Sequence, residues 1–195
     1  NMVKDQNLSD AETREEVKRL LKSKKGSPGE KNNPFAINLY ILGYNSDKNL
    51  SILNRAVKEN LKTYIGEYRM LTDGINIIDG YVINIGLDFE IRVYGGYNKR
   101  EVLTTVQTKL SEYFNIDNWT FNNTINLSEL ELIVANVDGV SSVPKLEIVN
   151  KCGGQYSPNS YNIQAAIKDK ILYPSLDPSV FEIKYPDVDI KGRAR

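Results

Sequence analysis

The sequence predicts an α+β fold, because segments with a two-residue hydrophobic period alternate with amphipathic helices. The clearest strand is 81–93, where apolar side chains occupy one parity and polar residues or glycine the other. The clearest helix is 98–114, which begins with Asn98 and Glu101 at N-cap and N3 spacing. Between 35 and 150 the order is strand, helix, one or two strands, helix, helix, strand. We therefore expect a ferredoxin-like α/β sandwich with its helices on one face of the sheet.

The other elements of this predicted domain follow the same patterns. A helix is expected over 50–68, and a short strand over 75–78 with the turn Asp79-Gly80 after it. A further helix is expected over 126–138, followed by a closing strand over 143–149.

One face of the long strand is predicted to be wet. Its polar parity carries Asn84, Gly86, Asp88, Glu90 and Arg92, which we expect to face solvent. At about 3.3 Å per residue the strand would span roughly 40 Å, which is longer than most strands. A bulge or bend is therefore expected at Gly86.

The N-terminal segment 1–34 differs from the rest of the chain. Ser9 begins a capping-box sequence and a narrow apolar stripe follows, so a helix is predicted over 10–23. Glycine, proline and charged residues dominate 24–34, which predicts a linker. The globular domain is expected to begin at Phe35.

The C-terminal segment 151–195 is predicted to form an extended, proline-spaced arm. It is too apolar for a disordered tail, and Phe181 to Tyr185, between two prolines, reads as a short edge strand. We expect this arm to bury its apolar side chains on another chain, although packing on its own domain is the alternative. The candidate interface residues are Tyr173, Leu176, Phe181, Ile183 and Tyr185.

Composition argues against several classes of function. Lys+Arg and Asp+Glu both number 25, so no net charge would attract nucleic acid or a membrane surface. Histidine is absent, which excludes Ser-His-Asp and Cys-His catalysis within this chain.

The single cysteine, Cys152, can form neither an internal disulfide nor a cysteine-based zinc site, which favours a reducing cytoplasm. We expect no cofactor, no small-molecule substrate, no nucleic-acid partner and no membrane partner.

The remaining candidates for chemistry have simpler structural interpretations. Paired carboxylates could act as acid and base, but Asp88 and Glu90 fit a wet strand face and Glu129, with Glu131 near it, fits a helix start. The strand 80–85 has a passing likeness to an RNA-recognition strand but lacks its leading basic residue and later aromatics. The sequence therefore predicts a protein that is not an enzyme.

Two groups of motifs indicate a family. The first comprises 97–103, Tyr113-Phe114, Trp119, 125–130 and 137–140, and the second comprises 60–64, 68–73, 75–77 and 174–182. The first group resembles the closing half of the baseplate J-like family, and the second resembles the baseplate wedge subunits of T-even-type contractile-tailed phages within it. The resemblance covers roughly residues 36 to 190, whereas 1–35 match no motif of the family.

The resemblance implies a structural component of a virion, in the baseplate wedge of a contractile tail and assembled in the host cytoplasm. Its partners would be copies of itself, as a homodimer or ring, and other baseplate wedge proteins. Because the family proteins are much longer, we expect this chain to be a C-terminal part. The alternative is a small-ligand-binding or enzymatic domain on a ferredoxin-like frame, which fold alone does not exclude.

Overall fold

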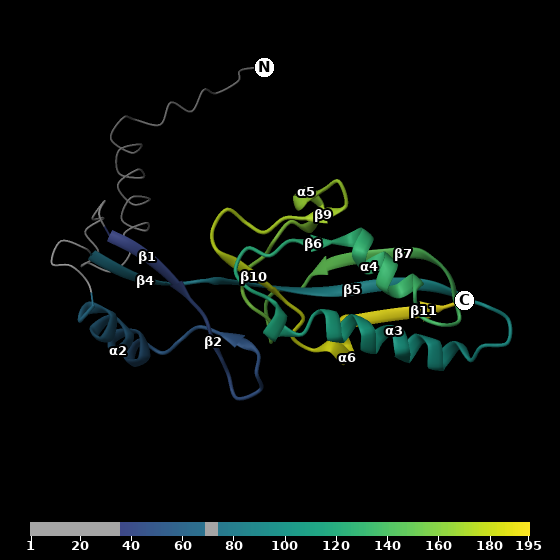
Figure 1. Ribbon diagram of the computed structural model, residues 1–195, viewed down its shortest axis with the longest axis horizontal. Coiled ribbons are helices and arrows are strands. Elements are labelled where there is room, and N and C mark those ends of the chain that lie inside the picture. The colour runs from purple at the N-terminus through teal and green to yellow at the C-terminus, as the bar shows by residue number, and fades with distance from the viewer. Residues whose placement is uncertain (1–35, 69–73) are drawn as a thin grey trace, which may run out of the picture.

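The computed structural model describes residues 36–68 and 74–195, which form helices together with parallel and antiparallel strands (Figure 1). The α+β class predicted from the sequence is confirmed. The predicted helix 10–23, the linker 24–34 and the strand start at Phe35 lie outside the described residues.

The main sheet is built around β5 (Tyr81–Val93), which runs along most of the molecule (Figure 1). On one side β5 pairs antiparallel with β7 (Val140–Asn150). On the other side two short strands lie parallel to it: β10 (Ser179–Glu182) pairs with its first half and β11 (Ile190–Ala194) with its second half. The C-terminal segment therefore completes the same sheet as the predicted domain.

Two helices separate β5 from β7 in the sequence, namely α3 (Lys99–Tyr113) and α4 (Leu127–Ala135). Both begin as predicted, because the Asn98 side chain accepts a hydrogen bond from Arg100 N and the Asn126 side chain accepts from Ser128 N. A ferredoxin-like fold alternates its elements as β-α-β-β-α-β. The consecutive placement of α3 and α4 does not follow that order, and the ferredoxin-like arrangement is not confirmed.

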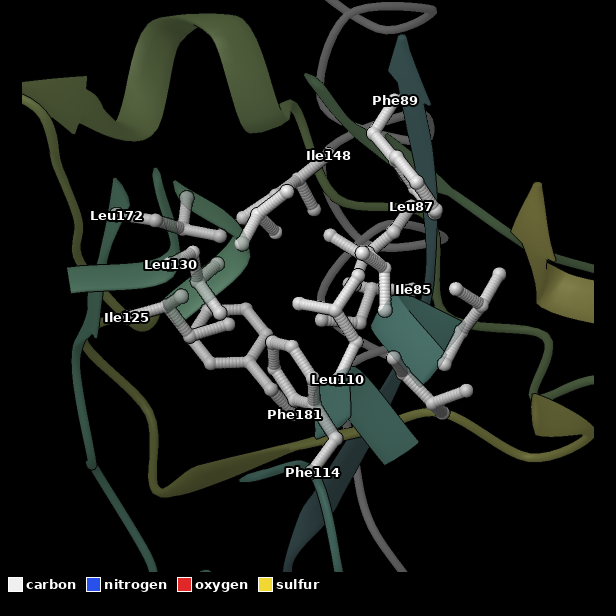
Figure 2. Close-up of a cluster of buried hydrophobic side chains, with 14 of the residues drawn as sticks. Ile85, Leu87, Phe89, Leu110, Phe114, Ile125, Leu130, Ile148, Leu172 and Phe181 are labelled. Atoms are coloured by element: carbon white, nitrogen blue, oxygen red, sulfur yellow. The ribbon is translucent and has the colours of Figure 1, made fainter. Parts of the chain in front are cut away.

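The hydrophobic core lies between this sheet and the two helices (Figure 2). Its side chains come from nearly every element after residue 80, including Ile85, Leu87, Phe89, Leu110, Phe114, Ile125, Leu130, Ile148, Leu172 and Phe181. Gly192 in β11 lies under the ring of Phe89, where a Cβ atom would collide with that ring. The C-terminal strands are thus packed into the core as well as hydrogen-bonded to the sheet.

The second face of β5 is not wet along its first half, which corrects the sequence prediction. Asn84 and Gly86 are buried, Asp88 and Glu90 are half-buried, and only Arg92 of the polar parity is exposed. The reason is that later segments cover this face. A Cβ atom on Gly86 would lie 2.8 Å from Cε of Lys151 and 3.0 Å from the carbonyl oxygen of Asp189.

The predicted bulge is also displaced. Gly86 pairs regularly with Val149 of β7, and the register shifts lie between Glu90, Arg92 and Val93. Gly86 is therefore required for close packing of covering segments and not for a bend.

The boundary predicted at residue 150 is wrong, because the segment after it is part of the same compact unit. A small sheet of β6 (Ile125–Asn126), β9 (Ile171–Leu172) and β8 (Ile167–Lys168) closes one side of this unit. The short helices α5 (Ile163–Ala166), α6 (Pro186–Asp189) and η1 (Ile116–Asn118) complete the connections. We call residues 80–195 the core lobe.

The remaining described residues, 36–68 and 74–79, form the α2 lobe at the far end of the long sheet (Figure 1). There β1 (Ala36–Ile41) pairs parallel with β4 (Gly74–Asp79), and the short strands β2 (Gly43–Tyr44) and β3 (Leu50–Ser51) form a hairpin.

The helix predicted over 50–68 is α2 (Arg55–Gly66), and it begins later than expected. Leu50 and Ser51 are in β3, and the side chain of Asn54 caps the helix by accepting a hydrogen bond from Ala56 N at 3.1 Å. The turn predicted at Asp79-Gly80 is wrong, because β4 does not pair with β5 and instead leads into it through Gly80.

Candidate assembly surface

The interface residues predicted from the sequence separate into two groups. Phe181 is only 2% exposed and Ile183 is also buried, because β10 packs both into the core of its own chain. Tyr173 and Leu176 are exposed, and Tyr185 is half-buried with its ring 5.8 Å from that of Tyr156. The prediction that the C-terminal segment docks on another chain is therefore wrong for Phe181 and Ile183. For Tyr173, Leu176 and Tyr185 it stays a prediction.

Exposed large apolar side chains are densest on the α2 lobe, where the sequence predicted a helix packed on a sheet. No residue of α2 is buried, and Val57, Tyr64 and Tyr68 are 48%, 60% and 74% exposed. Other large apolar side chains exposed on the same lobe are Ile37, Tyr44 and Ile52. Contiguous exposed apolar patches are rare on monomeric proteins and often mark interaction sites.

The exposed apolar residues of α2 form one stripe, which continues into the turn after the helix. Val57, Leu61, Tyr64 and Tyr68 fall within a sector of about 60° on a helix of 3.6 residues per turn. Leu61 is half-buried, and the rings of Tyr64 and Tyr68 contact each other at 5.2 Å between centroids. Lys58 anchors the other side of α2 through an ion pair with Asp79 at 2.6 Å. The helix thus contacts β4 through Lys58, while among residues 36–68 and 74–195 no side chain buries its apolar stripe.

A buried carboxylate connects the α2 lobe to the core lobe. Glu182, 3% exposed, accepts a hydrogen bond from Leu50 N at 2.5 Å and another from Nδ2 of Asn84 at 2.7 Å. Asn84 in turn accepts a hydrogen bond from Ser157 N at 2.7 Å. One side chain of β10 therefore ties the β2–β3 hairpin to the centre of the main sheet.

Burial is the main influence on this carboxyl group. Desolvation raises the pKa of Glu182 above its ordinary value of 4.5, while the hydrogen bonds from Leu50 and Asn84 and the charge of Lys184 act in the opposite direction. The net effect is a raised pKa, so the folded protein holds this proton more tightly than the unfolded chain does.

A second buried carboxylate, Asp189, is satisfied within the core lobe. The hydroxyl of Tyr156 donates to it at 2.6 Å, and Tyr185 N donates to its other oxygen at 3.0 Å. The hydrogen bond to Asp189 is the largest of the causes that raise the pKa of Tyr156 to about 12. Lys151 lies 4.0 Å away. These contacts hold the 151–159 loop against the C-terminal turn.

A groove of about 850 Å³ lies beside Glu182, between α3, the β2–β3 hairpin and the turn after β10. Its charged lining mixes signs, with Asp47, Glu112, Asp117, Glu182 and Asp187 against Lys48 and Lys184. Both oxygens of Glu182 already accept hydrogen bonds from the protein. The most buried carboxylate of the groove is therefore already engaged by groups of the same chain.

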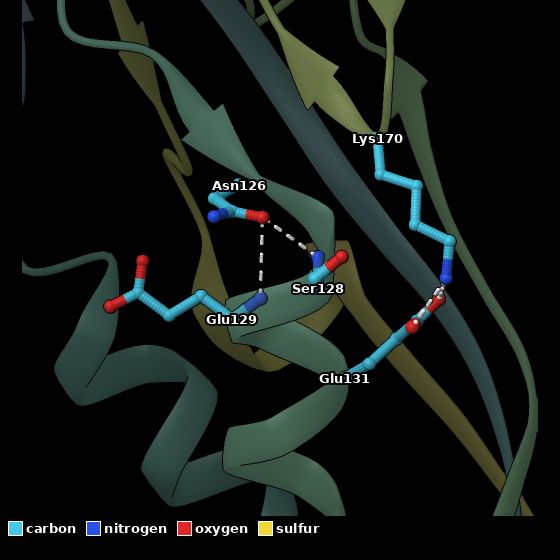
Figure 3. A network of polar contacts seen from close by, with 5 residues as sticks. All are labelled: Asn126, Ser128, Glu129, Glu131 and Lys170. Carbon is cyan, nitrogen blue, oxygen red and sulfur yellow. Dashed lines mark hydrogen bonds and ion pairs between the residues drawn. The ribbon is translucent and has the colours of Figure 1, made fainter.

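Glu129 and Glu131, two of the carboxylates considered for catalysis, lie on α4 (Figure 3). Glu129 lies in the first turn of α4 and accepts a hydrogen bond from the Tyr113 hydroxyl at 3.2 Å, while Glu131 forms an ion pair with Lys170 at 2.8 Å. Burial, followed by the charge and hydrogen bond of Glu129, raises the pKa of Tyr113 to about 12.

Along β5, Glu90 pairs with Arg195 at 2.8 Å. The structure does not bring Asp88, Glu90, Glu129 and Glu131 together, because the first two lie on β5 and the others on α4.

Within the described ranges, 36–68 and 74–195, no group of three or more His, Cys, Asp or Glu side chains is placed to hold a metal ion. Among the same residues no helix is long and apolar enough to cross a membrane. Cys152 is a free and exposed thiol.

Sequence reasoning missed the buried pair of Asn84 and Glu182. A signal was present, because both are polar residues inside apolar strand segments, and a polar residue there requires a partner. Their common partner could not be found from periodicity, since the two residues are 98 positions apart.

No protein-family model and no curated protein sequence matches this chain. The family resemblance consequently remains a hypothesis drawn from sequence motifs. The functional proposal rests on those motifs and on the surface of the α2 lobe.

Proposed function

We propose that this chain is a structural, non-catalytic module of a contractile phage-tail baseplate wedge, which assembles through self-association and through contacts with other wedge proteins. The observation that carries the proposal is the uncovered apolar stripe of α2. Burying such side chains against a partner is favourable by roughly 25 cal/mol for each Å² removed from water.

The sheet of the α2 lobe also supports an assembly role. In the part of the chain that the structure describes, it consists of the parallel pair β1 and β4. Parallel sheets are normally covered on both faces, and an isolated pair of strands is marginally stable in water. A lobe of this kind gains stability when a partner covers its exposed residues, so the unit suits a protein that functions within an assembly.

The motifs that carry the family resemblance have structural positions in the fold. The 97–103 motif begins α3, and the 125–130 motif forms β6 and the first turn of α4. The rings of Phe114 and Trp119 stack at 5.4 Å between centroids, and Gly139 has a positive φ of 93° before β7. These contacts give the motifs roles in the folding of the core lobe.

The alternative is a small-ligand-binding or enzymatic domain on a ferredoxin-like frame, and the groove beside Glu182 is the feature that would serve it. It has less support, because the most buried carboxylate of the groove is already occupied by Leu50 N and Asn84.

A mass measurement over a range of concentrations tests the proposal. We expect the chain to self-associate as its concentration rises, and to co-migrate with other wedge proteins, in the absence of any small molecule. The Asp88→Asn, Glu90→Gln and Asp138→Asn variants are expected to assemble normally. A chain that stays monomeric and binds no wedge protein would contradict the proposal. So would phage particles that carry one of these variants, assemble in normal number and yet fail to infect, because that result would indicate a chemical step.

A further inference from the structure

We propose that α2 packs antiparallel against α2 of a second copy of this chain, through the stripe formed by Val57, Leu61, Tyr64 and Tyr68. The inference rests on the proposed assembly function and names the partner for its surface. It follows from the spacing and symmetry of these four residues and from the exposure of Val57, Tyr64 and Tyr68.

The spacing of the stripe matches a helix-pairing seam. The four residues are separated by four, three and four positions, which is the a and d pattern of a heptad repeat. Tyr68 follows the last residue of α2, yet its N–H donates to the carbonyl of Ile65 at 3.1 Å and its ring remains against Tyr64. All four side chains are therefore available on one side of the element.

The stripe is symmetric about the midpoint between Lys62 and Thr63. If a second copy is turned around that point, Val57 lies opposite Tyr68 of the second copy, and Leu61 lies opposite its Tyr64. Each layer then combines an aliphatic residue with a tyrosine, so a small side chain faces a large one. The same operation is the two-fold rotation that relates identical surfaces in most homodimers.

Side-chain size also favours the antiparallel direction. A parallel arrangement would place Tyr64 opposite Tyr64 and Tyr68 opposite Tyr68, so two large side chains would share one layer of the seam.

The size of the contact predicts a weak dimer. A helix of 12 residues is about 18 Å long at 1.5 Å per residue, and one such pair cannot reach the roughly 800 Å² per partner of a standard interface. Exposed Tyr44 and Ile52 on the same lobe can add to the area. Dimerisation should therefore depend on concentration in isolation and become strong where a ring holds the copies together.

Disulfide trapping tests the orientation in the full chain, with Cys152→Ser as background to remove the exposed native thiol. Antiparallel packing predicts that a Val57→Cys variant mixed with a Tyr68→Cys variant forms a disulfide-linked dimer. Neither variant alone should do so, because equivalent residues at position 57 would lie about 16 Å apart along the axis, beyond the Cα separation of about 7 Å that a disulfide spans. Cross-linking of each variant with itself would indicate parallel packing and would overturn the inference.

A charge substitution tests the surface without cysteine. Tyr64→Lys is expected to weaken the dimer at least tenfold, measured by mass photometry or sedimentation. Thr63→Lys is the matched control, since Thr63 is exposed on the opposite side of α2 and should leave dimerisation unchanged. Circular dichroism of both variants shows whether the fold is retained. Equal dimerisation of wild type and Tyr64→Lys would overturn the inference.

The helix predicted over 10–23, outside the described residues, is the alternative partner for the stripe. We expect rapid thiol labelling of the Val57→Cys variant at high dilution and protection as its concentration rises. Protection at every dilution would mean that the chain covers its own stripe, and self-pairing through α2 would be wrong. A wild-type chain that self-associates while α2 neither cross-links nor responds to Tyr64→Lys would refute this inference and leave the proposed function standing.

Discussion

The two lobes contain the same kinds of elements and differ in what covers them. In the core lobe α3 buries Val102, Val106 and Leu110, whereas α2 buries no residue at all. Both helices carry apolar residues three or four positions apart and both begin at an asparagine cap. Helical periodicity therefore predicts which side of a helix is apolar. It does not predict whether the residues that bury this side belong to the same chain.

The largest expected loss of stability follows removal of the C-terminal segment, which belongs to the core lobe. A chain that ends at Asn150 would lose β10 and β11 together with the buried Leu172, Phe181 and Ile190, so it should show no cooperative thermal unfolding. Circular dichroism during heating makes the measurement, with the full chain as reference. A sharp transition in the truncated chain would show that the core lobe does not need its last strands.

The next comparison uses one aromatic residue from each lobe. Phe89→Ala should lower the free energy of unfolding by about 3–5 kcal/mol, because the ring is buried against Gly192 and Leu103. Tyr64→Ala, at an exposed position of α2, should change it by less than about 0.5 kcal/mol in the monomer. Urea denaturation at low protein concentration gives both values. Similar losses of unfolding free energy in the two variants would show that α2 is buried within its own chain as the core lobe is.

A smaller effect is expected inside the core lobe at Asp189. Tyr156→Phe removes the hydroxyl that donates to this fully buried carboxylate, which should cost about 1–3 kcal/mol of unfolding free energy. Tyr185→Phe is the matched control, because Tyr185 bonds Asp189 through its backbone N–H and not through its hydroxyl. If urea denaturation gives equal losses for the two variants, the hydroxyl of Tyr156 has no special role.

The smallest effect concerns Glu182, which joins the lobes. Because burial raises its pKa in the folded state, its contribution to stability is greatest when it is protonated, and falls as pH rises from its ordinary pKa of 4.5 through the raised folded value. The Glu182→Gln variant cannot lose that proton. The unfolding free energy of wild type minus that of Glu182→Gln should therefore decrease with pH over this window and then become constant. A difference that is independent of pH would contradict the raised pKa.

Local features of the fold were predictable from the sequence. The long strand, the starts of α3 and α4 and the amphipathic character of α2 follow from side-chain period and from Asn98 and Asn126 as caps. These signals lie within a few residues of each other, which is why one sequence is enough to detect them.

The errors came from contacts between distant segments. The second face of β5 was predicted to face water. The residues that cover Asn84 and Gly86 come from the 151–159 loop and from Asp189, which are distant in the sequence and leave no local pattern near β5. Likewise, the prolines around Phe181 were interpreted as marking an arm, although β10 uses its edge position to pair with β5. The candidate surface on α2 was predicted as a stripe, but its lack of cover could only be seen in the structure.

The pairing of β5 with both C-terminal strands has a consequence for how the protein forms during synthesis. Asn84 and Glu182 are bonded although 98 residues separate them, and the pairing with β11 extends to Ala194. One edge of β5, the central strand of the core lobe, therefore has no partner strand until nearly all of the described chain has left the ribosome. Contacts at such sequence separation slow folding, and an incomplete sheet edge is prone to pair with other nascent chains. We accordingly expect the core lobe to complete its folding only after Ala194 has left the ribosome, and its yield to depend on chaperones that shield β5.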